Sequence, residues 1–505
     1  MMGYFSMSNL EHLLARYNDV RLLGQANAVL GWDQQCYMPH GGGAARAAQT
    51  SVLSRITHEM FTSQDTGVLL AAAEQDNTGS DPASKDAQML RVLRRDYDQE
   101  TKLPTDLVEA LTRESMLAHE VWVDARKNDD FKTFAPTLQK LLDLVRRQAD
   151  CLGYDETPYD ALLDRYEPGL KSSDAAKVFD SIKPVIASIL AKVRATPEID
   201  DSVLRRVFPE AQQIAFGEKV VRYLGFDFNH GRQDKAVHPF CTGLDRTDVR
   251  ITTRIEENWL PCALMGTMHE AGHGMYEQGF LPEDDGTPLG SAVSLGFHES
   301  QSRLWENTVG RSQAFWNKFY PELQAAFPGV LDDVSLAQFY KAINKVQPSL
   351  IRVEADEVTY NLHVLMRFEL EKQLIEGTLA VKDLPDAWNA KVKEYLGIDV
   401  PSNAQGCLQD VHWSAGLIGY FPTYSVGTVL AAQLYDAALT QTPGLSTDIE
   451  NADYSRLLGW MRTNVHHPGR RFLPTELVEK SCNAPFSAEP YIAYLTTKYG
   501  AIYGA

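Results

Sequence analysis

The residues with the clearest chemistry form the string His-Glu-Ala-Gly-His at positions 269–273. On an α-helix, His269 and His273 lie about 40° apart around the axis, so both imidazoles can bind one metal ion. Glu270 is offset from that pair and can accept a proton from water that the metal activates. The surrounding residues favour a helix over 262–277. The string therefore predicts a zinc-dependent hydrolytic site; a surface helix with two unconnected histidines is the alternative.

A catalytic zinc site needs a third protein ligand and one open position. The next predicted helix offers candidates in the string His-Glu-Ser-Gln at 298–301, which follows a turn at 282–290. Glu299 is the predicted third ligand. His298 is its rival, but neighbouring residues on a helix point about 100° apart, so only one of the two can face the metal.

Other polar clusters are harder to explain as scaffold. The segments 238–240 (His-Pro-Phe) and 248–252 (Asp-Val-Arg-Ile-Thr) are placed on two short strands. Residues at 352, 356, 359 and 363 form a polar stripe on a predicted helix, and a solvated face with an Arg352–Asp356 ion pair explains that stripe equally well. His412 lies in a loop broken by Gly and Pro, ahead of two tyrosines at 420 and 424 that could simply pack there.

The elements that must position these residues are mostly helices. Apolar residues recur every three or four positions, so the expected fold class is all-α dominated. The predicted helices cover residues 8–30, 44–62, 105–128, 133–152, 174–195, 208–224, 261–279, 291–309, 336–376, 427–440 and 487–499. The exception is 235–254, where Val249, Ile251 and Thr253 alternate as in a half-buried strand. Two short strands are expected there, immediately before the helix with the two histidines.

Composition excludes several classes of protein. The 505 residues exceed one simple core, so several domains or one two-lobed body are expected. The 67 acidic and 48 basic residues give a formal net charge of -19, which repels nucleic acid. The six cysteines have no CxxC spacing, and neither a signal peptide nor a membrane-spanning segment is recognisable. A cytoplasmic protein without a membrane or nucleic-acid partner is expected.

Six strings in order carry a resemblance to a known family. They are HPF at 238–240, DVRIT at 248–252, HEAGH at 269–273, HESQ at 298–301, IRVEAD at 351–356 and GCLQDVHW at 406–413. Together they resemble the thermostable, Taq-type metallocarboxypeptidases, peptidase family M32. The motifs span residues 238–413; the helical sequence on either side is compatible with the family but carries no motif of it.

The resemblance implies a two-lobed helical fold with a deep central groove, similar to the angiotensin-converting enzyme and neurolysin group. It implies one catalytic domain over residues 1–505, with the active-site motifs within 238–424, and a homodimer. It also implies one Zn²⁺ per chain, which other divalent ions such as Co²⁺ can replace. The activity it implies is the release of amino acids from peptides with a free C-terminus.

The resemblance also implies roles for individual residues. His269, His273 and Glu299 would bind the metal, and Glu270 would be the general base. The substrate would be bound by His238, Arg250 and Arg352, and Arg352 is the first candidate for binding its carboxylate. The oxyanion or the peptide backbone would be stabilised by His412, Tyr420 and Tyr424. An endopeptidase or oligopeptidase with the same zinc chemistry is one alternative. A peptide-binding protein without turnover is another, although the presence of Glu270 argues against it.

Overall fold

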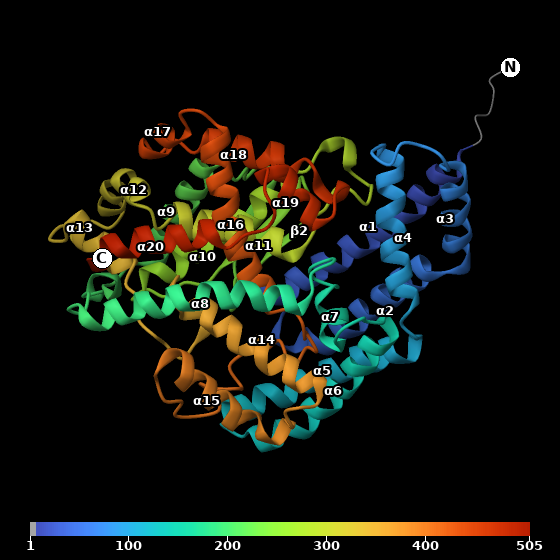
Figure 1. The fold of residues 1–505 in the computed structure, drawn as a ribbon, viewed down its shortest axis with the longest axis horizontal. Coiled ribbons are helices and arrows are strands. Elements are labelled where there is room, and N and C mark those ends of the chain that lie inside the picture. The colour runs from blue at the N-terminus through green and yellow to red at the C-terminus, as the bar shows by residue number, and fades with distance from the viewer. Residues whose placement is uncertain (1–6, 505) are drawn as a thin grey trace.

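The computed structural model describes residues 7–504, and about 67% of the chain is helical. The first four helices form a separate bundle at one end of the molecule, drawn in blue in Figure 1. They have a small apolar core of their own that includes Leu13, Leu70 and Leu93. The helices of this bundle are α1 (Asn9–Cys36), α2 (Gly43–Thr62), α3 (Gln64–Asp76) and α4 (Lys85–Thr101).

The rest of the described chain packs around two large apolar cores, which define two lobes. The lower lobe has α5 (Thr105–Lys127), α6 (Phe131–Leu152), α14 (Tyr360–Glu376) and α15 (Leu384–Leu396) at the bottom of Figure 1, and its core also includes side chains of α7 (Pro158–Leu163), α8 (Ser172–Ala195) and α20 (Glu489–Tyr503). Helix α20 lies higher in this view, level with α10. The upper lobe contains α9 (Glu210–Leu224), α10 (Leu260–Glu277), α11 (Leu295–Arg303), α12 (Gln313–Ala326), α13 (Leu336–Ile343), α16 (Pro422–Gln441), α17 (Leu445–Glu450), α18 (Ser455–Met461) and α19 (Pro474–Cys482).

Helix α16 joins the two lobes, because it contributes side chains to both cores. Val429 and Ala432 belong to the lower core, whereas Leu430 and Leu434 belong to the upper one. Within residues 7–504, no helix combines the length and the apolar character that a membrane span requires. The predicted fold class, a predominantly helical two-lobed body with a small β element, is confirmed.

The β element contains three strands rather than the two predicted. They are β1 (Gly231–Lys235), β2 (Cys241–Asp245) and β3 (Asp248–Thr253), in the spatial order β1-β3-β2. Strand β3 pairs in parallel with β1 and antiparallel with β2. The placement of 238–240 on a strand is wrong: these residues form the connection between β1 and β2. Pro239 has no N–H to donate to a strand ladder, which is one reason that pairing stops there.

The single helix predicted over 336–376 is also wrong. The chain leaves α13 at Ile343 and starts α14 only at Tyr360. Pro348 disfavours the helical conformation of the residue before it. Asp356 then accepts hydrogen bonds from the backbone N–H groups of residues 358 and 359, which holds the chain in a turn ahead of Thr359, the N-cap of α14. The polar stripe at 352, 356, 359 and 363 is therefore not one face of a helix.

Candidate active site

Close helix crossings bring the histidine pair and Glu299 together. His269, Glu270 and His273 lie on α10, and Glu299 lies on α11, which packs against it. A Cβ atom on Gly272 would lie 2.6 Å from the backbone O of Gln301, so only glycine allows the two helices this close. The same holds on the other side of α11, where a Cβ on Gly427 of α16 would lie 2.6 Å from the Cβ of Glu299.

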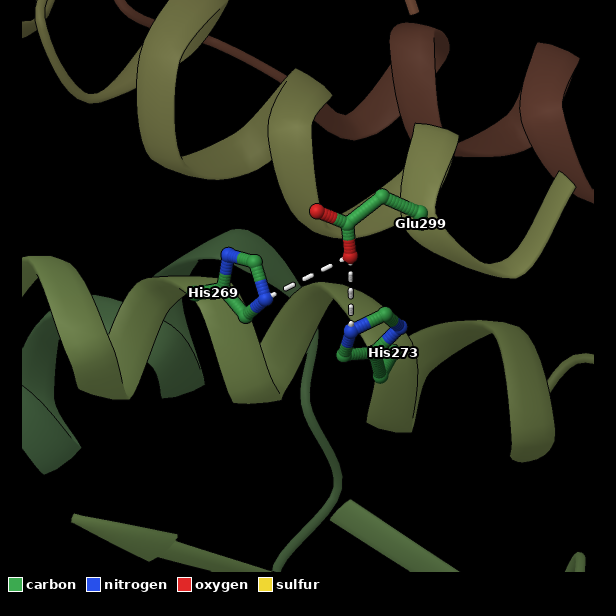
Figure 2. Close-up of side chains that lie close together, drawn as sticks. All are labelled: His269, His273 and Glu299. Atoms are coloured by element: carbon green, nitrogen blue, oxygen red, sulfur yellow. Dashed lines mark ion pairs between the residues drawn. The ribbon is translucent and has the colours of Figure 1, made fainter. Parts of the chain in front are cut away.

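Three donor atoms converge at this crossing (Figure 2). The Oε2 atom of Glu299 lies 3.5 Å from Nε2 of His269 and 3.4 Å from Nε2 of His273. All three atoms lie within 4.8 Å of one another, and this is the only such group of His, Cys, Asp and Glu among residues 7–504. Two imidazole nitrogens and one carboxylate oxygen form the ligand set of catalytic zinc sites. The residues therefore fit a bound metal ion.

The second oxygen of Glu299 is held by its own helix. Oε1 accepts a hydrogen bond of 2.6 Å from Nε of Arg303, one turn further along α11. Burial disfavours the charged carboxylate, but Arg303 and His269 outweigh that effect and hold the pKa of Glu299 well below its usual range. Glu299 is therefore a fixed anion that directs one oxygen toward the two histidines.

The outer nitrogen of His269 also has a carboxylate partner. Nδ1 lies 2.8 Å from Oε2 of Glu306, which stands in a π-helical turn, η4 (Leu304–Val309), directly after α11. Arg303 lies 3.4 Å from the same oxygen. Such a carboxylate–imidazole contact fixes the tautomer that leaves Nε2 free for a metal, and π-helical turns are frequent at functional sites.

His273 is held differently. Its ring stacks on that of His298, with centroids 4.3 Å apart and planes 17° apart, while its buried Nδ1 has no partner among the described residues. Nε2 of His298 lies 2.9 Å from Oε1 of Glu277. His298 is thus engaged with Glu277 and stands outside the convergent group that contains Glu299.

Glu270 is 6% exposed, and its carboxyl has the properties that a proton acceptor needs. Burial raises the pKa of Glu270 to about 7, against the opposing effect of His269. A cation bound to the neighbouring donors would stabilise the charged form and lower this pKa. Glu270 therefore combines burial beside the convergent group with a carboxyl that a metal ion bound there would favour in its ionised form.

A second cluster surrounds Arg352, which is 5% exposed. Nε of Arg352 donates to Asp410 at 3.1 Å, and Nη1 donates to the hydroxyl of Tyr360 at 3.0 Å. The guanidinium also lies 4.9 Å from the ring centre of Tyr424, whose hydroxyl is 3.2 Å from Nε2 of His412. The Arg352–Asp356 ion pair, which was the alternative explanation of the polar stripe, does not form, because Asp356 accepts hydrogen bonds from the turn ahead of α14 and Arg352 pairs with Asp410.

The two clusters are linked through Tyr360. Its ring lies 4.1 Å below the guanidinium carbon of Arg303, the partner of Glu299, and its hydroxyl contacts Arg352. Tyr420 packs against His412 and Tyr424, with ring centroids 5.4 Å from each. Arg352 is therefore connected to Glu299 through Tyr360 and Arg303, and Tyr424 and Tyr420 pack next to Arg352 and to each other.

Of the other two predicted substrate contacts, Arg250 lies away from this cluster, whereas His238 is close enough to Arg352 and Asp410 for their charges to affect its pKa. Arg250 is bound to Asp248 through contacts of 2.9 and 2.8 Å, and its guanidinium lies 4.3 Å from the ring centre of Trp32 on α1. Among the described residues, Arg250 contacts none of the three convergent donors. His238 is exposed on the connection between β1 and β2. Partial burial, and after it the charge of Arg254, lower the pKa of His238.

Sequence reasoning missed Arg303, Glu306, Tyr360 and the partner role of Asp410. Arg303 and Glu306 follow Glu299 by four and seven positions, a spacing that places side chains on one helix face and could have identified them. Asp410 lies within a motif, but no local pattern joins it to Arg352. The contact forms only when the chain folds.

The comparison with family models decides the class of protein. The model for carboxypeptidase Taq (M32) metallopeptidases matches residues 12–499. The chain belongs to this family. It is 40% identical to thermostable carboxypeptidase 1 of Thermus thermophilus, over 98% of this chain and 99% of the relative. It is 36% identical to carboxypeptidase 1 of Bacillus subtilis, over 95% of each chain.

Solved structures agree with this membership. The M32 carboxypeptidase of Deinococcus radiodurans superimposes with a TM-score of 0.95 at 41% identity, covering 98% of this chain and 100% of that one. The carboxypeptidase of Pyrococcus furiosus gives a TM-score of 0.93 at 34% identity, covering 98% and 100%. The chain is a metallocarboxypeptidase, and its family implies a divalent metal ion and peptide substrates.

Proposed function

We propose that the chain is a carboxypeptidase that uses one zinc ion, held by His269, His273 and Glu299, to release amino acids from the C-terminus of peptides. The observation that supports this most is the convergence of their three donor atoms within 4.8 Å. The donor set, two imidazoles and one carboxylate, is one that catalytic zinc uses. Other divalent ions such as Co²⁺ share this ligand preference and would substitute.

Glu270 is the proposed general base. When bound, zinc supplies a Lewis acid that lowers the pKa of water and polarises a carbonyl. Glu270 then takes a proton from the attacking water and transfers it to the leaving amine. Its buried position next to His269 and Glu299 supports this role, because a carboxylate shielded from solvent holds the proton between the two transfers.

Arg352 is the proposed site for the substrate carboxylate. A guanidinium offers parallel hydrogen bonds that fit a carboxylate. Asp410 and Tyr360 occupy Nε and Nη1 of Arg352, while Nη2 donates to no described residue. Arg352 is preferred over Arg250, whose guanidinium is already occupied by Asp248.

His412, Tyr420 and Tyr424 are the proposed donors to the oxyanion or to the peptide backbone. Burial raises the pKa of Tyr420 to about 12, and Glu299 contributes to the increase. Tyr420 therefore keeps its proton and can donate it in a hydrogen bond. Losing one such donor typically adds about 2.7–4 kcal/mol to the barrier. His238, exposed on its connection, is proposed as a further contact to the substrate.

Three wider properties belong to the same proposal. The match across residues 12–499 supports one catalytic domain over the whole chain. The resemblance to the family supports a homodimer. The sparse cysteines, all free in the structure, support a cytoplasmic location.

The Glu270→Gln variant tests the proposed chemistry. It should bind zinc with unchanged stoichiometry and keep its melting temperature, while turnover falls about 10²–10⁴-fold. Elemental analysis and a kinetic assay on the same preparation measure both. Near-normal turnover would show that another group accepts the proton.

A further inference from the structure

Glu371 on α14 is a fully buried carboxylate that the proposed chemistry does not use. It is 0% exposed and forms no ion pair with any described residue. Three hydrogen bonds satisfy it instead. Oε1 accepts from Nε1 of Trp413 at 2.8 Å, while Oε2 accepts from the hydroxyl of Tyr159 at 2.8 Å and from the backbone N–H of Gly419 at 3.1 Å.

Two of these donors stand next to residues of the proposed site. Trp413 directly follows His412, and Gly419 directly precedes Tyr420. Glu371 therefore accepts hydrogen bonds from the segment 412–420 close to both of its ends. The segment has little freedom at the second point, because Gly419 has φ +88° and a Cβ there would lie 2.9 Å from backbone atoms of residues 162 and 163.

A carboxylate suits these contacts because it accepts at both oxygens. Burying one without a counterion is costly unless hydrogen bonds replace the lost water. A glutamine of the same shape has one acceptor oxygen and one NH₂ group. If its oxygen faces Tyr159 and Gly419, its NH₂ group faces the N–H of Trp413, and two donors then oppose each other. Only an acceptor at both positions holds both ends of the segment.

We propose that Glu371 is a positioning residue for peptide hydrolysis, which holds segment 412–420 so that His412 and Tyr420 face the substrate. This inference rests on the proposed function, in which those two residues contact the reacting peptide. Glu371 itself does not touch substrate. Its effect is transmitted through the side chain of Trp413 and the backbone of Gly419.

The test is a double-mutant cycle between Glu371→Gln and Trp413→Phe, with kcat expressed per zinc-loaded chain and measured far below the melting temperature. We expect Glu371→Gln to lower kcat at least tenfold, and Trp413→Phe to lower it about threefold. In the Trp413→Phe background the glutamine meets no opposing donor, so adding it should cost little more. The indole N–H resonance of Trp413, identified by its loss in Trp413→Phe, should shift in Glu371→Gln.

Parallel variants separate this inference from the proposed function. His412→Ala and Tyr420→Phe should each lose activity; if both keep full kcat, the proposed roles of those residues fail. If they lose activity while Glu371→Gln keeps kcat within twofold despite a shifted Trp413 resonance, the positioning role is overturned. If Glu371→Gln does not fold, Trp413→Phe decides alone, because unchanged kcat in that variant would contradict the inference. A lower melting temperature with unchanged kcat would make Glu371 purely structural.

Discussion

Replacing Glu306 with glutamine keeps the size of the side chain but removes the charge behind His269. In the native protein, Oε2 of Glu306 lies 2.8 Å from Nδ1 of His269, and their side chains are only 14% and 19% exposed. Water therefore screens this contact weakly. A charge-assisted hydrogen bond of this kind is worth about 1.5–3 kcal/mol. At about 1.4 kcal/mol per tenfold change, the loss corresponds to roughly 10–100-fold weaker zinc binding.

Competition with a chelator of known zinc affinity measures this change directly, without reference to peptide hydrolysis. Glu277→Gln is the matched control, since Glu277 also pairs with a histidine, His298, at 2.9 Å, but that histidine is not a proposed ligand. The control should keep its zinc affinity within about threefold. Unchanged affinity in Glu306→Gln would refute the reasoning. An equal loss of zinc affinity in both variants would mean that the affinity depends on the negative charge near the site in general, and not on the hydrogen bond between Glu306 and His269.

The remaining predictions concern the substrate, the metal and the helix crossing. Arg352→Ala should lower kcat/KM for peptides with a free C-terminus far more than for amidated ones; a large stability loss with unchanged discrimination would make Arg352 scaffold. Removing zinc with a chelator should lower the free energy of unfolding. Compared with protein in free zinc at one hundred times Kd, the decrease should be about 2.7 kcal/mol. A calorimetric melting temperature that zinc leaves unchanged would contradict this. Gly427→Ala should displace Glu299 and weaken zinc binding. Gly459→Ala is its control, because nothing lies within 4 Å of that added Cβ; equal zinc affinity in both would remove the steric argument.

Local periodicity predicted much of the fold because the relevant signals lie within single elements. The apolar spacing around 262–277 predicted α10 almost to its ends, since the helix spans Leu260–Glu277. The break between α13 and α14 escaped the same reasoning. Apolar residues continue at helical spacing through this region, and the interruption depends on Pro348 together with hydrogen bonds accepted by Asp356.

In the candidate site, too, the residues that follow a local spacing could be predicted, whereas those that depend on contacts between distant segments could not. His269 and His273 were predicted as ligands because a ligand pair one helix turn apart leaves a fixed pattern in the sequence. Glu299 was predicted from the string at 298–301 on the next helix. The partners that orient them come from contacts between distant segments. Arg352 and Asp410 are 58 positions apart, and Arg303 reaches Arg352 only through the ring of Tyr360. No spacing rule specifies such contacts, because they depend on how the helices pack.

Digestion of one defined peptide, followed over time by mass spectrometry, tests the central claim most directly. The peptide is supplied with a free and with an amidated C-terminus, and each digestion is run with zinc-loaded and chelator-treated protein. The account predicts a ladder of products shortened one residue at a time from the free C-terminus, little cleavage of the amidated form, and none after chelation until zinc is restored. Internal cleavage at equal rates in both peptides, or an activity that survives removal of the metal, would contradict it.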